Sequence, residues 1–98
     1  MDTTSTGTDV PISLPRVMQS AAGGRSTVLV RAGTVGEAVD ALVDQHPDLS
    51  HLLLTPERDV NRFVNIYIDA DDVRFLQGLD TTIVAGQRIT LISAVAGG

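Results

Sequence analysis

The residues whose types suggest chemistry in this 98-residue sequence are the last three, Ala96-Gly97-Gly98. They would form a thin, extended segment, because glycine carries no Cβ and its backbone can approach another protein closely. Three or four extended residues span about 10–14 Å. The carboxylate of Gly98 is a poor electrophile, but coupling to AMP would make it reactive. A partner enzyme would then supply the catalysis, and this chain would supply the substrate.

No catalytic constellation accompanies this ending. Cys is absent, which excludes thiol nucleophiles, disulfides and iron–sulfur ligation. All seven basic residues are Arg, so a P-loop lysine and a Schiff-base lysine are excluded too. The lack of Lys fits either a coding preference for Arg or a protein that must not acylate itself. His46, His51 and Asp48 lack the spacing of a recognised metal site, so we expect no metal in this chain. Because no catalytic constellation is present, we also expect no enzyme activity.

The composition limits the classes of protein to which this chain can belong. Hydrophobic residues make up 43% and charged residues 19%, which indicates one globular domain. The formal charge is −5 and no stretch is basic, so we expect neither nucleic acid nor an anionic membrane as partner. No apolar run approaches about 18 residues, and the segment Met1–Asp9 has no signal-peptide character. We therefore expect a cytoplasmic protein.

The periodicity of the apolar residues predicts the secondary-structure elements that must position the C-terminal segment. Alternating apolar residues predict strands at 10–14, 28–32, 63–68, 73–75 and 88–95. The loop at 15–25 joins the first two strands into a hairpin, and the residues at 69–72 form a turn.

One helix stands out among these strands. Thr34 and Glu37 form a capping box, in which Thr34 accepts from the Glu37 amide and Glu37 reaches back to Thr34. An apolar stripe follows at helical spacing, and His46-Pro47 ends the helix. Leu49, Leu52 and Leu53 predict a further short helical turn. Because strands outnumber the one good helix, we expect an α+β fold with a mixed sheet and the helix on one face.

Three segments of this sequence resemble the ThiS/MoaD family of ubiquitin-like sulfur carriers, which have the β-grasp fold. The segments are Arg62-Phe63-Val64-Asn65-Ile66-Tyr67, Asp71-Asp72-Val73-Arg74-Phe75 and Ala94-Val95-Ala96-Gly97-Gly98. The resemblance covers roughly residues 9–98 and is greatest for the CysO-type branch. It implies a β-grasp domain at 9–95, preceded by a flexible extension at 1–8 and followed by an extended tail at 96–98.

The resemblance also implies carrier chemistry at Gly98. An E1-like adenylating enzyme of the MoeB/ThiF type would use Mg-ATP to adenylate the carboxylate, and sulfide or a persulfide would replace AMP. The resulting thiocarboxylate would donate sulfur to a synthase that makes cysteine or a thio-containing metabolite or cofactor, and a metal-dependent peptidase could regenerate the tail. The carrier itself would bind no cofactor and would be a monomer when free.

Two other readings stay open. A ubiquitin-like modifier would use the same tail to join Gly98 to lysines of target proteins. A plain β-grasp interaction module would never have its tail activated.

The surface that a partner would recognise is predicted from strand alternation, combined with the β-grasp strand order that the resemblance implies. Ile89 and Leu91 should face the helix, which leaves the residues between and beyond them on the outer face. The predicted partner-binding patch consists of Phe63, Tyr67, Thr90, Ile92, Arg62 and Arg74, and the segment that threads into the partner's active site consists of Ala94, Val95, Ala96 and Gly97. An exposed apolar patch of this kind marks an interface, unless the loops at 15–25 or 55–61 cover it.

Overall fold

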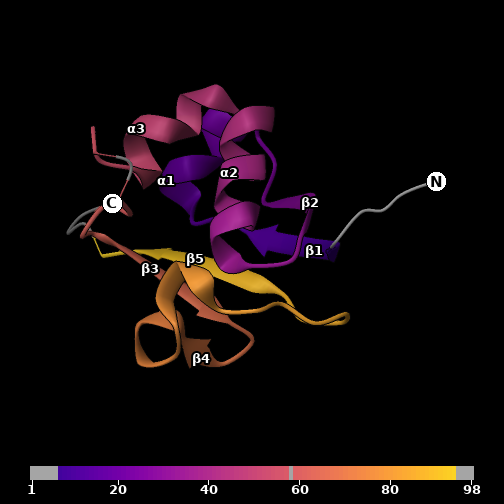
Figure 1. The fold of residues 1–98 in the computed structure, drawn as a ribbon. Coiled ribbons are helices and arrows are strands. Elements are labelled where there is room, and N and C mark those ends of the chain that lie inside the picture. The colour runs from indigo at the N-terminus through magenta and orange to yellow at the C-terminus, as the bar shows by residue number, and fades with distance from the viewer. Residues whose placement is uncertain (1–6, 58, 95–98) are drawn as a thin grey trace.

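The computed structural model of the chain describes residues 7–57 and 59–94. The expectations for most of the extension at 1–8, for Val95 and for the tail at 96–98 lie outside the described residues. Within them, five strands form one sheet with the order β2-β1-β5-β3-β4 (Figure 1). The strands are β1 (Thr8–Ser13), β2 (Thr27–Ala32), β3 (Val64–Ile68), β4 (Asp71–Asp72) and β5 (Ile89–Ser93).

The sheet is mixed, as the sequence predicts. β1 pairs with β2 in antiparallel register, which confirms the expected hairpin. β5 lies between β1, to which it is parallel, and β3, to which it is antiparallel. The strand that leads to the end of the sequence is therefore central in the sheet and is hydrogen-bonded on both sides.

The helical segments gather on one face of the sheet (Figure 1). They are α1 (Arg16–Gln19), α2 (Val35–Gln45) and α3 (Ser50–Leu53), with the 3-10 turns η1 (Ser20–Ala22) and η2 (Pro47–Leu49). Two further 3-10 turns, η3 (Val73–Phe75) and η4 (Gly78–Asp80), follow β4 at the edge of the sheet. The core between helices and sheet is filled by aliphatic side chains, among them Ile12, Leu42 and Ile89, which are fully buried. This is the β-grasp arrangement that the resemblance implies.

The main helix begins where the capping box predicts it. Thr34 is the N-cap of α2, and its Oγ1 accepts from the Glu37 N–H at 3.2 Å. The reciprocal bond differs from the expectation, because the Glu37 carboxylate accepts from the N–H of Gly33 at 2.8 Å rather than from that of Thr34. The observed bond satisfies the backbone N–H of Gly33, just ahead of the helix.

Two local expectations are wrong. The return strand predicted at 73–75 is instead the two-residue strand β4 at Asp71–Asp72, and Val73–Phe75 forms the 3-10 turn η3. The Asp72 side chain accepts from the Arg74 N–H at 2.8 Å, which bends the chain out of the sheet. The loop predicted at 15–25 contains α1 and η1, which bury Met18 and Ala22.

Candidate functional site

The outer face of the β3–β5 ladder carries the apolar side chains that the alternation predicts there. In the register, Asn65 stands opposite Ile92 and Tyr67 opposite Thr90. Ile92 is therefore the diagonal neighbour of both Phe63 and Tyr67 on the same face. We call Phe63, Tyr67, Thr90 and Ile92 the outer patch.

The outer patch is accessible to a partner. Phe63 is 50% exposed and Ile92 43% exposed, whereas Tyr67 and Thr90 are half-buried. The alternative in which loops cover these side chains therefore does not apply to Phe63 and Ile92. The opposite face of the same strands is buried, with Ile89 and Leu91 packed toward the helix as expected.

The ladder ends at the point where the C-terminal segment leaves the sheet. The N–H of Ala94 donates to the carbonyl of Phe63 at 2.7 Å, one residue beyond the last residue of β5. Ala94 is exposed. Its bond to Phe63 places the start of the Ala94–Gly98 segment directly beside the outer patch. Val95, Ala96, Gly97 and Gly98 lie outside the described residues.

A groove of about 210 Å³ opens at the same end of the sheet. Its rim carries the exposed side chains of Val17 from α1, Leu52 from α3 and Phe63. We call it the end groove, and its lining residues are Val17, Met18, His51, Leu52, Asn61, Phe63, Val64 and Ser93. Phe63 belongs to both the groove and the outer patch, so the two surfaces meet at Phe63, whose carbonyl is bonded to Ala94.

Sequence reasoning missed Val17 and Leu52 as members of the end groove. Val17 was expected in a loop, and Leu52 in a short helical turn with no assigned role. The one local signal for α1 is Pro15, which occupies the N-cap position before Arg16. Nothing in the sequence pattern brings α1, α3 and the start of β3 together.

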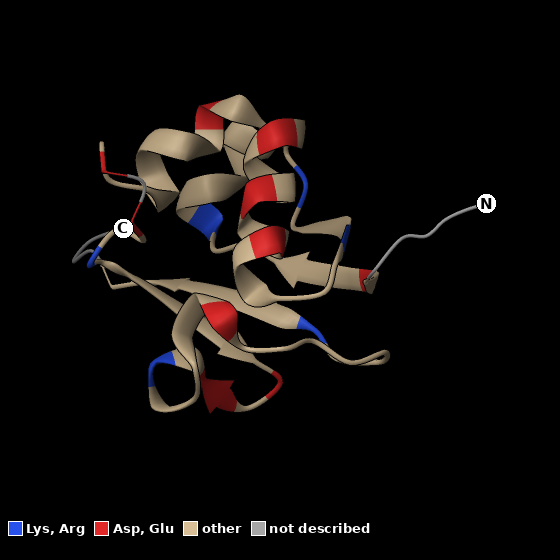
Figure 2. Cartoon of the chain, viewed as in Figure 1, with Lys and Arg blue, Asp and Glu red and all other residues tan. Residues whose placement is uncertain are grey.

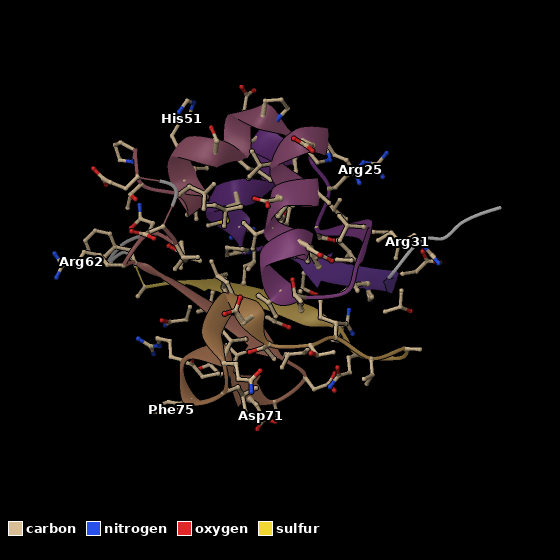
Figure 3. All side chains as sticks on the ribbon, in the orientation of Figure 1. Arg25, Arg31, His51, Arg62, Asp71 and Phe75 are labelled. Carbon is tan, nitrogen blue, oxygen red and sulfur yellow. The ribbon has the colours of Figure 1, made fainter. Side chains whose placement is uncertain are left out.

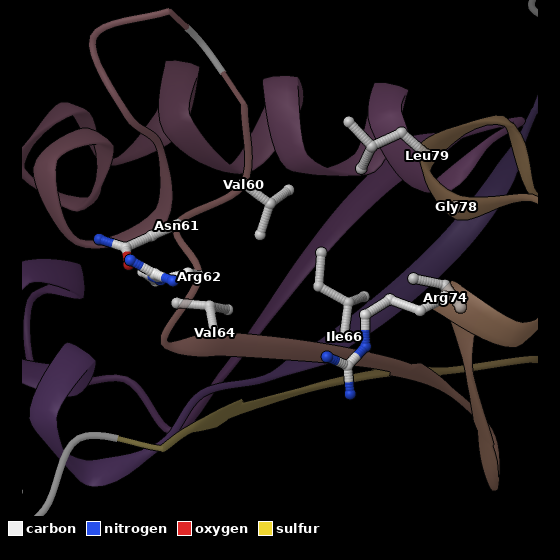
Figure 4. Close-up of a pocket in the computed structure, with 9 residues that line it drawn as sticks. Val60, Asn61, Arg62, Val64, Ile66, Arg74, Gly78 and Leu79 are labelled. Carbon is white, nitrogen blue, oxygen red and sulfur yellow. The ribbon is translucent and has the colours of Figure 1, made fainter.

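The two arginines assigned to the patch occupy a different position. Arg62 and Arg74 are exposed and line a pocket of about 360 Å³ together with Val64 and Ile66, whose side chains face the helices (Figure 4). They therefore border β3 along its edge. Arg74 is connected to the outer patch through Asp72, which stands opposite Tyr67 in the register.

Arg74 is held in place by the carboxylate of Asp72. The Arg74 Nη2 lies 2.8 Å from Asp72 Oδ2, and the Arg74 Nε lies 3.2 Å from both carboxylate oxygens. These side-chain bonds, together with the bond from the Arg74 N–H, hold the pKa of Asp72 below its ordinary value and raise the pKa of Arg74. The pair fixes the turn that follows β4.

The placement of the acidic residues also bears on metal binding. In the part of the chain that the structure describes, no three His, Asp or Glu side chains are grouped closely enough to hold a metal ion. Glu37, Asp40 and Asp44 lie along α2, where Figure 2 shows the acidic residues in one row. None of the helices at residues 7–57 and 59–94 is long and apolar enough to cross a membrane.

Comparisons with known proteins agree with this geometry. The model of the ThiS family matches residues 12–98. The sulfur carrier protein CysO of Mycobacterium tuberculosis is 36% identical over 92 residues, which is 92% of this chain and 99% of that protein. The relatives found are named as carriers rather than as enzymes.

Solved structures of similar proteins share the fold. CysO of Amycolatopsis orientalis, crystallised in complex with BexX, is 34% identical and superposes with a TM-score of 0.81 over 91% of this chain and 99% of that one. Small archaeal modifier protein 1 of Haloferax volcanii is 26% identical, with a TM-score of 0.81 over 93% of this chain and 100% of that one. The chain therefore belongs to the ThiS family of small, ubiquitin-like sulfur carriers.

Proposed function

We propose that the Gly98 carboxylate of this protein is adenylated by an E1-like enzyme and converted to a thiocarboxylate that donates sulfur to a biosynthetic enzyme. The observation that supports this proposal is that the outer patch and the end groove, with their exposed apolar side chains, meet at Phe63 beside Ala94, four residues before Gly98. Such surfaces would let a partner bind the folded domain while its active site receives the C-terminal segment.

The chemistry divides between the two proteins. A carboxylate oxygen of Gly98 would attack the α-phosphorus of ATP and release pyrophosphate, which leaves an acyl-adenylate. Hydrosulfide would then attack the carbonyl carbon and expel AMP, which leaves a thiocarboxylate. Mg²⁺ and ATP would be bound by the enzyme. The carrier would supply the acyl group and the surface that positions it. Binding of the folded domain would raise the effective concentration of the acyl group at the reacting centre.

The absence of Cys and Lys supports this role. An acyl-adenylate reacts with thiols and amines, and this chain has neither in its side chains. The activated Gly98 would therefore not be consumed by a side chain of a neighbouring copy. A CysO relative that forms a complex with BexX supports the expectation of a partner protein.

Intact mass spectrometry tests the proposal. The purified chain is incubated with a MoeB/ThiF-type enzyme, Mg-ATP and sulfide. We expect a mass increase equal to the replacement of one oxygen by one sulfur, located on the C-terminal peptide. A variant that lacks Gly98 should show no adenylate and no sulfur. If the wild-type chain gains no sulfur while the same enzyme loads another carrier, the proposal is wrong.

A second candidate function is protein modification. It is favoured by the likeness to small archaeal modifier protein 1 at 26% identity. In that case incubation with cell extract and ATP would give adducts in which Gly98 is joined to lysine side chains of other proteins. A plain interaction module would give neither product, and deletion of Gly97 and Gly98 would leave its function unchanged.

A further inference from the structure

The edge of β3 is only half covered by the rest of the sheet. β4 pairs with β3 at Tyr67 and Ile68 alone. Among the described residues, no strand pairs with Val64–Ile66 on the side away from β5. An uncovered stretch of strand edge is a common contact point for a second protein.

A pocket of about 360 Å³ fills the gap beside this uncovered stretch. We call it the edge pocket. Its apolar wall combines Val64 and Ile66 of β3 with Val60, Val73 and Leu79, and Figure 4 shows Arg62 and Arg74 at opposite ends of it. The volume is sufficient for a large aliphatic or aromatic side chain.

The charge at the mouth of the edge pocket favours an acidic group in the partner. The chain has a formal charge of −5, yet two of its seven arginines line this one pocket. Arg74 is bound to Asp72. The side chain of Arg62 forms no hydrogen bond or ion pair with any described residue, and it points into solvent (Figure 3). Since none of residues 7–57 and 59–94 engages it, the Arg62 guanidinium can meet a carboxylate of a partner.

Phe75 extends the same surface. It is 83% exposed, the most exposed of the large hydrophobic side chains that the structure describes. It follows Arg74 directly, on the η3 turn that the Asp72–Arg74 bonds hold in one conformation. An aromatic side chain on a fixed turn loses little conformational entropy when a partner covers it. Arg62 and Phe75 lie on one side of the molecule, and Arg25 and Arg31 lie on the other (Figure 3).

We propose that the edge pocket and Phe75 form a second contact surface for the adenylating enzyme. The enzyme would place an apolar side chain in the edge pocket, set a carboxylate against Arg62 and cover Phe75. This inference rests on the proposed function. The adenylating enzyme is the occupant because both the carrier and the modifier need it, whereas their final acceptors differ. A segment of small residues offers an enzyme few side chains to bind, so binding must come from the folded domain.

Two exposed substitutions test this surface against two matched controls. Arg62→Glu reverses the charge at the pocket, and its control, Arg25→Glu, makes the same change on the opposite side. Phe75→Ser removes the aromatic side chain, and its control, Leu29→Ser, removes an exposed apolar side chain from β2. All four positions are exposed, so the fold should not change. Circular dichroism and thermal unfolding of each variant check this.

The measurement is carrier-dependent pyrophosphate exchange by the adenylating enzyme. We expect Arg62→Glu and Phe75→Ser each to raise KM for the carrier about tenfold with little change in kcat, which corresponds to about 1.4 kcal/mol. The effect of Arg62→Glu should shrink at high ionic strength, because added salt screens the ion pair. The controls should keep the wild-type KM.

If neither test variant raises KM above its control while wild-type chain is adenylated, the second contact surface is refuted and the proposed function stands. If the wild-type chain is not adenylated at all, both proposals are refuted together.

Discussion

Ala94 and Phe63 form the hydrogen-bonded pair at which the β3–β5 ladder ends, with the Ala94 N–H donating to the Phe63 carbonyl at 2.7 Å. The residue that leads toward Gly98 is thereby fixed beside the aromatic residue shared by the outer patch and the end groove. A partner that covers Phe63 would also fix the origin of the segment that ends in the Gly98 carboxylate. The effects of substitutions near this pair follow from that relationship.

Ile92→Asp should slow adenylation without unfolding the domain. The side chain is 43% exposed, so a carboxylate there remains hydrated in the free protein, but it would be desolvated in a complex. We expect KM for the carrier to rise at least about tenfold, as for an interface hot spot. Pyrophosphate exchange measures it, with Leu29→Asp as the control on β2. A KM equal to that of the control would remove the outer patch from the interface.

Leu52→Ser should weaken the complex through the end groove. Leu52 lines the groove together with Phe63 and Ser93, and it is partly exposed in the free protein. The loss of a covered leucine side chain should weaken binding by about 1–2 kcal/mol. Calorimetric titration with the adenylating enzyme measures this loss. Val84→Ser, which removes an exposed side chain from the connector before β5, should bind like wild type. Equal affinities for the two variants would contradict a role for the groove.

Asp72→Asn should make the protein less stable at neutral pH and flatten its response to acid. The bonds from Arg74 hold the pKa of Asp72 below the ordinary value of 3.8. A lowered pKa in the folded state adds stability above the unfolded pKa, and this stability is lost as pH falls through the folded pKa. The stability difference between wild type and Asp72→Asn should therefore be greater at neutral pH than in acid.

Urea unfolding of both proteins at about pH 7 and about pH 3 measures this difference. Asp71→Asn is the control, since it removes a carboxylate from the exposed neighbouring position. A difference between wild type and Asp72→Asn that is the same at both pH values would contradict the assignment.

Thr34→Ala should destabilise the domain by about 1 kcal/mol, because it removes the acceptor for the Glu37 N–H at the start of α2. For a domain of this size the melting temperature should fall by about 4–8 °C. Differential scanning calorimetry measures it. Glu37→Gln should have a smaller effect, since the amide oxygen can still accept from the N–H of Gly33. A melting temperature of Thr34→Ala equal to that of wild type would show that the cap contributes nothing.

The outer face of the sheet could be predicted from the sequence because strand alternation is strict in β3 and β5. Val64, Ile66 and Ile68 are buried, and the residues between them are not. A period of two assigns each side chain to a face without knowledge of the neighbouring strands. The position of Ile92 near Phe63 and Tyr67 needed the pairing of β3 with β5 as well, and that pairing was expected only because the resemblance implies the β-grasp strand order.

The return strand was misplaced because the local apolar pattern at Val73–Phe75 also fits a 3-10 turn. The decisive interaction is the cap from Asp72 to the Arg74 N–H, which a strand pattern does not reveal. As a result Val73 is buried and Phe75 is exposed, and both were expected to belong to a short strand.

The end groove and the edge pocket could not be predicted at all. The groove joins Val17, Leu52 and Phe63, which come from three segments distant in sequence. The edge pocket exists because β4 is two residues long and leaves part of β3 uncovered. Both depend on the tertiary packing of separate segments, which the periodicity of apolar residues does not reveal.

The central position of β5 has a mechanical consequence. Tension applied beyond Ala94 acts along a strand that is bonded to β1 on one side and to β3 on the other. Hydrogen bonds in both ladders are then loaded in shear and must break together, whereas an edge strand would peel away one bond at a time. If the proposed enzyme pulls on the C-terminal segment, the two ladders would carry that load and the domain would stay folded.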